Sequence, residues 1–186
     1  GRYHWNKRQI PEFEKAIVFY KQAIEKDPNY ALAYSGLADT YGLFPRFGAF
    51  RPKEYMPQAK QAALKALELD PNLAEAHTSL AQIALFYEYD FTGAEKSFKR
   101  AIELDPNYAT AHQWYGLLLA YIGKNEESVR EAKKAFELDP FSLRINSDLF
   151  SSLANANRFD EALLQNKKLN ELFPDERRFH QGNFQI

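Results

Sequence analysis

The sequence predicts an all-α solenoid of antiparallel helix pairs, and two observations support this prediction: an internal repeat and a pattern of small residues within it. The repeat is clearest as Ala-Ile-Glu-Leu-Asp-Pro-Asn-Tyr at residues 101–108. Related octapeptides stand at residues 23–30, 66–73, 135–142 and, in degraded form, 169–176. Their prolines are separated by 43, 35, 34 and 34 residues, and a period of about 34 residues is that of a helix–turn–helix unit.

Small side chains recur at fixed distances from the repeat proline. The position twelve residues before it holds Ala16, Ala59, Ala94, Ser128 and Ala162, and the position five before it holds Ala23, Ala66, Ala101, Ala135 and Leu169. The position eight before it is large in only two copies, and it holds Tyr20, Ala63, Phe98, Ala132 and Asn166. Alternating small and large residues at helical spacing allow two helices to approach closely and interlock.

Local signals mark where the helices begin and end. Pro11 and Pro52 fit the first turn of a helix, where a missing N–H costs nothing. Thr92 and Glu95 fit a capping box that opens another helix. The repeat prolines end each second helix, because proline disfavours a helical residue before it. These signals predict about ten helices and no strand.

In period, small positions and terminal proline, four copies of this pattern resemble the tetratricopeptide repeat family, over nearly the whole chain. The resemblance implies a right-handed solenoid of about four full repeats, with partial repeats at both ends. Residues 1–8 and 30–39 also resemble the C-terminal repeat arrays of bacterial multidomain signalling proteins and transcriptional regulators.

The repeat prolines divide the chain, which we expect to be a single domain over residues 1–186. The expected divisions are residues 1–29 (partial repeat 1), 30–72 (repeat 2, with a loop insertion at 42–52), 73–107 (repeat 3), 108–141 (repeat 4), 142–175 (repeat 5) and 176–186 (the start of repeat 6). Gly1 stands where a complete chain would have Met, so we expect a piece of a longer protein.

Composition narrows the classes of function. The chain has 186 residues, 24 Lys and Arg against 25 Asp and Glu, and no basic excess of the kind that nucleic-acid binders carry. Cysteine is absent, which excludes disulfides and zinc–thiolate sites. The longest apolar run, residues 114–122, is far short of a membrane span. A cytoplasmic location is favoured and a periplasmic one stays open.

Two segments depart from the period. Nine extra residues fall within 42–52, where Phe44, Phe47 and Phe50 are spaced by three. These rings either pack onto the neighbouring helix pair or form a partner-binding lip; we expect at least two of them to be buried, because exposing three would be costly. One further extra residue falls near residues 86–91, whose aromatics we expect to form a local cluster.

The sequence contains no motif for catalysis, cofactor binding or metal binding. Gly-rich phosphate loops and His-Glu-x-x-His are absent, so we expect no enzyme, no cofactor and no metal site. Three histidines, His77, His112 and His180, stand six residues after a repeat proline, where Tyr34 and Asn146 stand in other copies. We interpret this position as a packing site and not as a metal-ligand site.

The remaining candidate is the concave face, which in the family resembled is lined by the first helix of each repeat and binds peptides. The residues expected there are Ser35, Asp39, Thr78, Gln82, Gln113, Leu117, Arg144, Ser147 and Ser151. Such a face is polar and nearly neutral, and it lacks the Lys and Asn pattern with which chaperone-binding members clamp a carboxylate. Plain solvation of these residues is the alternative.

The sequence therefore predicts a non-catalytic protein–protein interaction module that binds a peptide or partner protein on its concave face. The alternative is a structural, self-associating or regulatory module of a larger bacterial signalling protein, acting through its ends and its aromatic loop. Neither alternative includes nucleic acid or insertion into a membrane. Self-association through terminal repeats is the further expectation, because an uncapped repeat leaves apolar surface uncovered.

Overall fold

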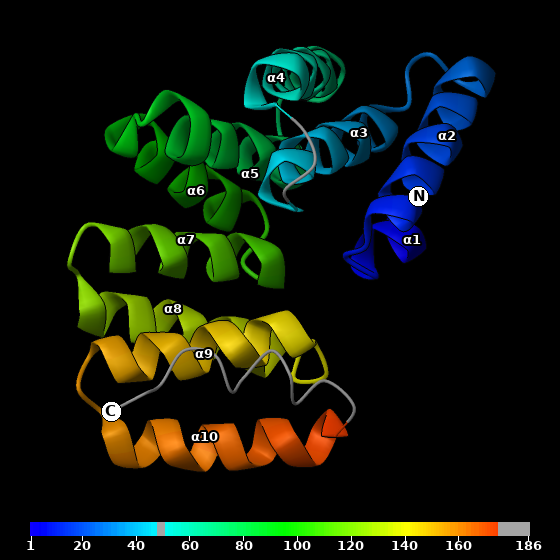
Figure 1. The fold of residues 1–186 in the computed structure, drawn as a ribbon. Coiled ribbons are helices and arrows are strands. Elements are labelled where there is room, and N and C mark those ends of the chain that lie inside the picture. Colours follow the sequence, from blue (N-terminus) through cyan, green and yellow to red (C-terminus); the bar gives the residue numbers. More distant parts are fainter. Residues whose placement is uncertain (48–50, 175–186) are drawn as a thin grey trace. The chain divides into compact units, whose positions relative to one another are not determined.

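The computed structural model describes residues 1–47 and 51–174, and every regular element in these two ranges is helical (Figure 1). The all-α prediction is thereby confirmed. The elements are α1 (Arg2–Asn6), α2 (Ile10–Lys26), α3 (Ala31–Leu43), η1 (Phe44–Phe47), α4 (Pro52–Leu69), α5 (Ala74–Ile83), η2 (Ala84–Glu88), α6 (Phe91–Leu104), α7 (Ala109–Tyr121), α8 (Asn125–Leu138), α9 (Leu143–Asn155) and α10 (Phe159–Leu172).

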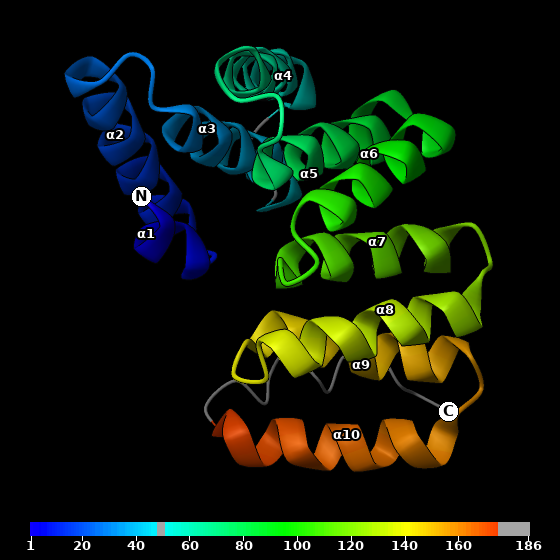
Figure 2. The same ribbon diagram turned by 180° about the vertical axis from the view of Figure 1, so that it is seen from behind.

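The chain forms two compact units, residues 1–106 and residues 107–186. Their boundary lies one residue before the expected division between repeats 3 and 4, and the expected repeat divisions stay a prediction. Within each unit the helices pair in sequence, with α3 against α4 and α5 against α6 in the first unit, and α7 against α8 and α9 against α10 in the second (Figures 1 and 2). The first helices of successive pairs also contact one another, α3 with α5 and α7 with α9. We call these first helices the inner helices.

The small residues lie where paired helices cross. Ala16, Ala59, Ala94 and Ser128, twelve residues before their prolines, are each 0% exposed. Gly116 on α7 shows how close the approach is, because a Cβ atom at this position would lie 3.3 Å from the Ser128 carbonyl oxygen of the paired helix α8. Small side chains therefore set the spacing of the pairs, as the sequence pattern predicts.

Each unit has its own apolar core. Phe13 and Phe98 are fully buried in the first unit. In the second, Val129, Leu149 and Leu153 form a cluster to which α8, α9 and α10 contribute. Burial of such side chains, at roughly 1.5–3 kcal/mol each, is the main source of stability for each unit.

The nine-residue insertion begins in η1, the short 3₁₀ helix that follows α3. Phe44 is 2% exposed, and its ring stacks on Tyr55 of α4 with centroids 5.0 Å apart and contacts Phe13 at 5.8 Å. For Phe44 the packing interpretation is thus confirmed. The Phe47 side chain and Phe50 lie outside the described residues, so the expectation that two rings are buried stays a prediction.

The single extra residue of the third repeat is absorbed by η2, a π-helical turn at the end of α5. A π-turn takes one more residue than an α-turn, which accounts for a spacing of 35 instead of 34. Phe86 within it lies under the guanidinium of Arg46, 4.1 Å from the ring centroid. Tyr89 and Phe91 are 73% and 42% exposed, and the expectation that the aromatic residues of 86–91 form a local cluster stays a prediction.

The same turn shifts the start of α6. Tyr89 adopts the left-handed conformation, with φ of 57°. Helix α6 then begins at Phe91. Asp90 is the N-cap, and its carboxylate accepts a hydrogen bond of 2.9 Å from the Gly93 N–H. The expected capping box of Thr92 and Glu95 is therefore wrong. The predicted first-turn prolines, Pro11 and Pro52, are confirmed in α2 and α4.

None of the helices in the described ranges is both long enough and apolar enough to cross a membrane.

Candidate functional site

The residues expected on the concave face all lie on inner helices, and they fall into one group in each unit. The first-unit group comprises Ser35, Asp39, Thr78 and Gln82, on α3 and α5. The second-unit group comprises Gln113, Leu117, Arg144, Ser147 and Ser151, on α7 and α9. The two groups differ in burial and in hydrogen bonding.

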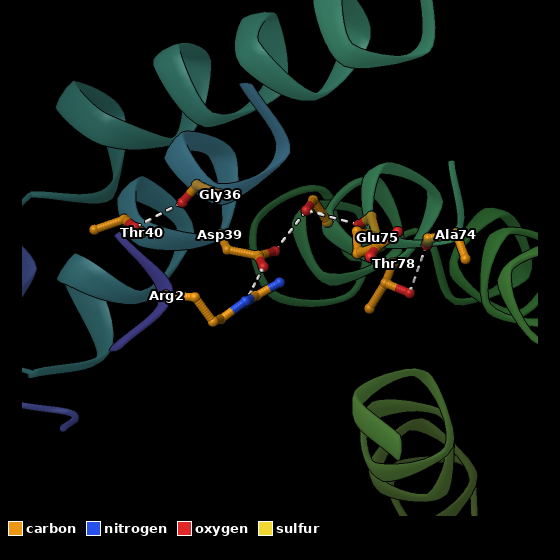
Figure 3. A network of polar contacts seen from close by, with 8 residues as sticks. Arg2, Gly36, Asp39, Thr40, Ala74, Glu75 and Thr78 are labelled. Atoms are coloured by element: carbon orange, nitrogen blue, oxygen red, sulfur yellow. Dashed lines mark hydrogen bonds and ion pairs between the residues drawn. The ribbon is translucent and has the colours of Figure 1, made fainter. Parts of the chain in front are cut away.

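Asp39 is the centre of a polar network in the first unit (Figure 3). Its side chain is 1% exposed and accepts hydrogen bonds from Arg2 Nη1 at 2.9 Å and from Ser79 Oγ at 2.5 Å. Arg2 belongs to α1 and Ser79 to α5, so one buried carboxylate joins α1, α3 and α5. The Arg2 guanidinium also lies 4.5 Å from the ring centroid of Trp5. Asp39 is thus both neutralised and fully enclosed.

The other three residues of the first-unit group are also buried. Thr78 is 0% exposed, and its hydroxyl donates to the Ala74 carbonyl at 2.9 Å within its own helix. Ser35 Oγ and Gln82 Nε2 are enclosed without a hydrogen-bond partner among the described residues. The expectation of a solvated polar face is therefore not met by Ser35, Asp39, Thr78 and Gln82. Side chains from neighbouring helices cover these four residues. The repeat spacing alone does not reveal that they are covered.

Apart from Gln113, which is 5% exposed, the second-unit group is more open. It surrounds a different carboxylate, that of Asp148 on α9. Gln113 Nε2 donates to Asp148 Oδ2 at 2.6 Å, and Arg144 Nε lies 3.3 Å from Asp148 Oδ1. The Asp148 side chain is 15% exposed and that of Arg144 is 50% exposed. Ser147 and Ser151 donate to carbonyls of their own helix.

Ser79 and Asp148 were not predicted as site residues, yet they occupy equivalent positions. Each stands eight residues after its repeat proline, Pro71 or Pro140. In each unit this position hydrogen-bonds to a residue of the preceding inner helix, Asp39 or Gln113. A polar residue eight positions after the proline is thus the sequence signal that would have identified both contacts.

A small cavity of about 30 Å³ lies among α7, α8 and α9 of the second unit. Its apolar lining is contributed by Leu117, Ala120, Ala132, Ala135 and Ile145. Its polar lining includes Gln113, Asp148 and Ser151. Gln113, Leu117 and Ser151, which the sequence assigns to the concave face, are therefore brought together at one hollow.

The position six residues after the repeat proline closes the turn between repeats. His77 Nε2 donates to the Pro71 carbonyl at 3.0 Å, and Asn146 Nδ2 donates to the Pro140 carbonyl at 2.8 Å. His112, 6% exposed, bonds through Nδ1 to Glu131 Oε2 at 2.7 Å. These contacts are the structural use expected of this position. Over the described ranges, no three His, Asp or Glu side chains gather as a metal site, and the absence of zinc binding stays a prediction.

Glu12, at the start of α2, has a carboxyl group whose pKa is strongly lowered. Lys15 contacts its Oε1 at 2.6 Å, while His4 and Lys7 contact its Oε2 at 2.7 and 3.2 Å. Hydrogen bonds from Lys15 and, to a smaller extent, from His4 lower the pKa of Glu12 from 4.5 to about 2. This cluster fastens α1 to α2, and α1 supplies the Arg2 that covers Asp39.

Family comparisons match three stretches of the chain. The family described as TPR repeat matches residues 9–43, and the family described as Tetratricopeptide repeat matches residues 74–108 and 109–142. Together these stretches cover more than half of the chain. They include the inner helices α3, α5 and α7.

Among curated proteins, the chain is similar to the Transcriptional regulator HilA of Salmonella typhimurium, with 29% identity over 140 residues. The match covers 75% of this chain and 25% of that protein, so the chain spans about a quarter of the length of this relative.

Solved structures share the fold. A thermophilic TPR protein from Thermus thermophilus superposes with a TM-score of 0.75 at 21% identity, covering 96% of this chain and 92% of that one. YrrB, described as a TPR protein with an unusual peptide-binding site, matches with a TM-score of 0.58 at 26% identity, covering 90% and 81%. MamA matches with a TM-score of 0.58 at 23% identity, covering 98% and 93%.

Proposed function

Since the chain belongs to the tetratricopeptide repeat family, whose members are typically non-catalytic interaction modules, we propose that its second unit binds an extended peptide or partner-protein segment on inner helices α7 and α9. The observation that supports this most is the hollow bordered by Gln113, Leu117 and Ser151. Arg144 and Ser147 extend the same surface along α9. The chain itself performs no catalysis in this proposal.

The chemistry of the surface suits main-chain recognition. Gln113 uses its amide N–H on Asp148, which leaves its carbonyl oxygen as an acceptor for a peptide N–H. Asp148 is balanced by Arg144, so the ligand needs no net charge. The likeness to YrrB supports a peptide as the class of ligand. Ser35, Asp39, Thr78 and Gln82 enter the proposal as residues that hold the first unit's inner helices together and not as direct contacts.

The test is selection of a displayed library of random dodecapeptides on the immobilised chain. Selected peptides would be synthesised with blocked ends and titrated by fluorescence anisotropy. We expect binding to be lost in Ser151→Trp, because Ser151 is exposed at the hollow and a large ring would cover it. Arg130→Trp, on the exposed surface of α8, is the matched control and should bind normally. Failure to select any peptide, or equal binding by Ser151→Trp, would contradict the proposal.

A second candidate function, self-association, is supported by α10. Three large apolar side chains there, Phe159, Leu163 and Leu164, are 57%, 66% and 57% exposed. Apolar surface of this kind favours contact with another chain. Sedimentation equilibrium should then give a dimer that the double substitution Leu163→Glu and Leu164→Glu converts to a monomer. A wild-type chain that stays monomeric at high concentration would contradict this candidate.

The likeness to Transcriptional regulator HilA supports a regulatory setting for the repeats. In this proposal the repeats receive a peptide signal within a longer regulatory protein. Co-purification of the full-length gene product, with and without Ser151→Trp, would test whether a partner depends on the same surface.

A further inference from the structure

One wall position of the second unit's cavity is small. Eight residues before the repeat proline, α8 carries Ala132, which lines the cavity, where α2 and α6 of the first unit carry Tyr20 and Phe98. A small residue here does not by itself leave a cavity, because Ala63 at the same position of α4 is 0% exposed. The hollow therefore depends on how α7, α8 and α9 pack and not on Ala132 alone.

The size of the cavity restricts what can enter. A volume of about 30 Å³ has room for one or two water-sized groups. A small group such as a methyl or isopropyl suits a cavity of this size better than a leucine or aromatic side chain does. The apolar walls are methyl groups of Ala120, Ala132 and Ala135, together with Leu117 and Ile145. An apolar group that leaves water for this lining is stabilised by roughly 0.8 kcal/mol for each methyl-sized unit buried.

The polar side of the cavity favours a group attached to a peptide main chain. Gln113, Asp148 and Ser151 line this side. Gln113 donates its amide N–H to Asp148, and its side-chain carbonyl oxygen can receive a main-chain N–H. A pocket that is apolar inside and polar at its edge can recognise one side chain of an extended peptide.

We propose that this cavity is a specificity pocket for one small aliphatic side chain, alanine or valine, of a bound extended peptide. The proposal rests on the proposed function and adds the class of residue that the site selects. Leu117 forms the wall that limits the length of the accepted side chain.

The test varies the peptide and then the wall. Each position of a selected, end-blocked peptide would be changed in turn to Gly, Ala, Val, Leu and Phe, and its Kd for the unaltered chain measured by fluorescence anisotropy. At one position Ala or Val should bind best, with about a fourfold loss for Ala→Gly. Leu and Phe at that position should lose more than tenfold. Peptides that bind with no position of this kind would overturn the pocket while leaving the proposed function intact.

Leu117→Ala enlarges the pocket and should move the preference at that same position towards Leu. Leu64→Ala, an equal truncation of a 50% exposed leucine on α4, is the control and should leave the preference unchanged. A Leu117→Ala chain that folds, with unchanged melting temperature, and keeps the Ala or Val preference would overturn the assignment of this wall. Because the peptide series uses the unaltered chain, the proposal can fail even if the variant does not fold. If no peptide binds at all, the proposed function and the pocket fail together.

Discussion

The inner helices of the two units use a carboxylate in different ways. In the first unit Asp39 is 2% exposed and is held between Arg2 of α1 and Ser79 of α5. In the second unit Asp148 is partly exposed and borders a cavity. The same repeat geometry therefore gives a closed, structural row in one unit and an open surface in the other. The outcome depends on which inner helix carries the acidic residue and on whether side chains of other helices cover it.

The position eight residues before the repeat proline differs in the same sense. Phe98 is fully buried in the third repeat, whereas Ala132 lines the hollow beside α7 in the fourth. The small residue alone does not make a pocket, because Ala63 stands at the same position of α4 and is 0% exposed. The twelve-before position, Ala94 or Ser128, is fully buried in both repeats.

The largest expected effect concerns the filled position. Phe98→Ala should lower the free energy of unfolding by about 3–5 kcal/mol, because it removes a fully buried ring and leaves a cavity. Phe141→Ala, an equal truncation at a 77% exposed site in the second unit, is the control and should change stability by under about 0.5 kcal/mol. Urea unfolding followed by circular dichroism measures both. Similar losses in the two variants would contradict the comparison.

Substitution of the two carboxylates should change stability less than Phe98→Ala does, and Asp39 should matter more than Asp148. Asp39→Asn should cost about 1–3 kcal/mol, because Arg2 and Ser79 lose a charged acceptor in a buried site. Asp148→Asn should cost under about 1 kcal/mol, because its pair with Arg144 is half-exposed. The same urea titrations give both values. An Asp148→Asn chain as destabilised as Asp39→Asn would show that the second unit's row is structural too.

Acid should weaken the first unit through Glu12. Its pKa is about 2 in the folded chain against 4.5 ordinarily, so the folded chain binds fewer protons than the unfolded chain between these values. The stabilisation by Glu12 is thus complete above about pH 4.5 and is lost as the pH falls towards about 2. Glu12→Gln should remove part of the stability difference measured between pH 6 and pH 3. An unchanged pH dependence in this variant would show that contacts of Glu12 with Lys15 and His4 add nothing.

Much of the fold was predictable, because the repeat records local packing. The small residues at Ala16, Ala59 and Ala94 predicted the crossings of paired helices, and all three are fully buried. The tetratricopeptide fold inferred from the period is confirmed by the family matches. The start of α6 was wrong, since the π-turn and the left-handed Tyr89 place Asp90 at the N-cap. The spacing of the repeat prolines reveals the extra residue, but it does not show that a π-turn accommodates it.

The candidate site was predictable only in part. Helical spacing placed Gln113, Leu117 and Ser151 on inner helices, and they do line one hollow. The same spacing placed Asp39 and Thr78 at equivalent positions, yet both are buried. Their burial depends on contacts across the sequence, such as Arg2 with Asp39, which the periodicity of one helix does not contain. The assignment of all these residues to a partner-binding face stays a proposal.

Chemical-shift mapping tests the central claim most directly, namely that the second unit's inner helices receive the ligand while those of the first unit serve as structure. The ¹⁵N-labelled chain would be titrated with a selected, end-blocked peptide. We expect the largest shifts at backbone amides of α7 and α9, including Leu117 and Ser151, and small shifts at Asp39 and Thr78 on α3 and α5. Shifts concentrated on α3 and α5, with α7 and α9 unchanged, would contradict the claim.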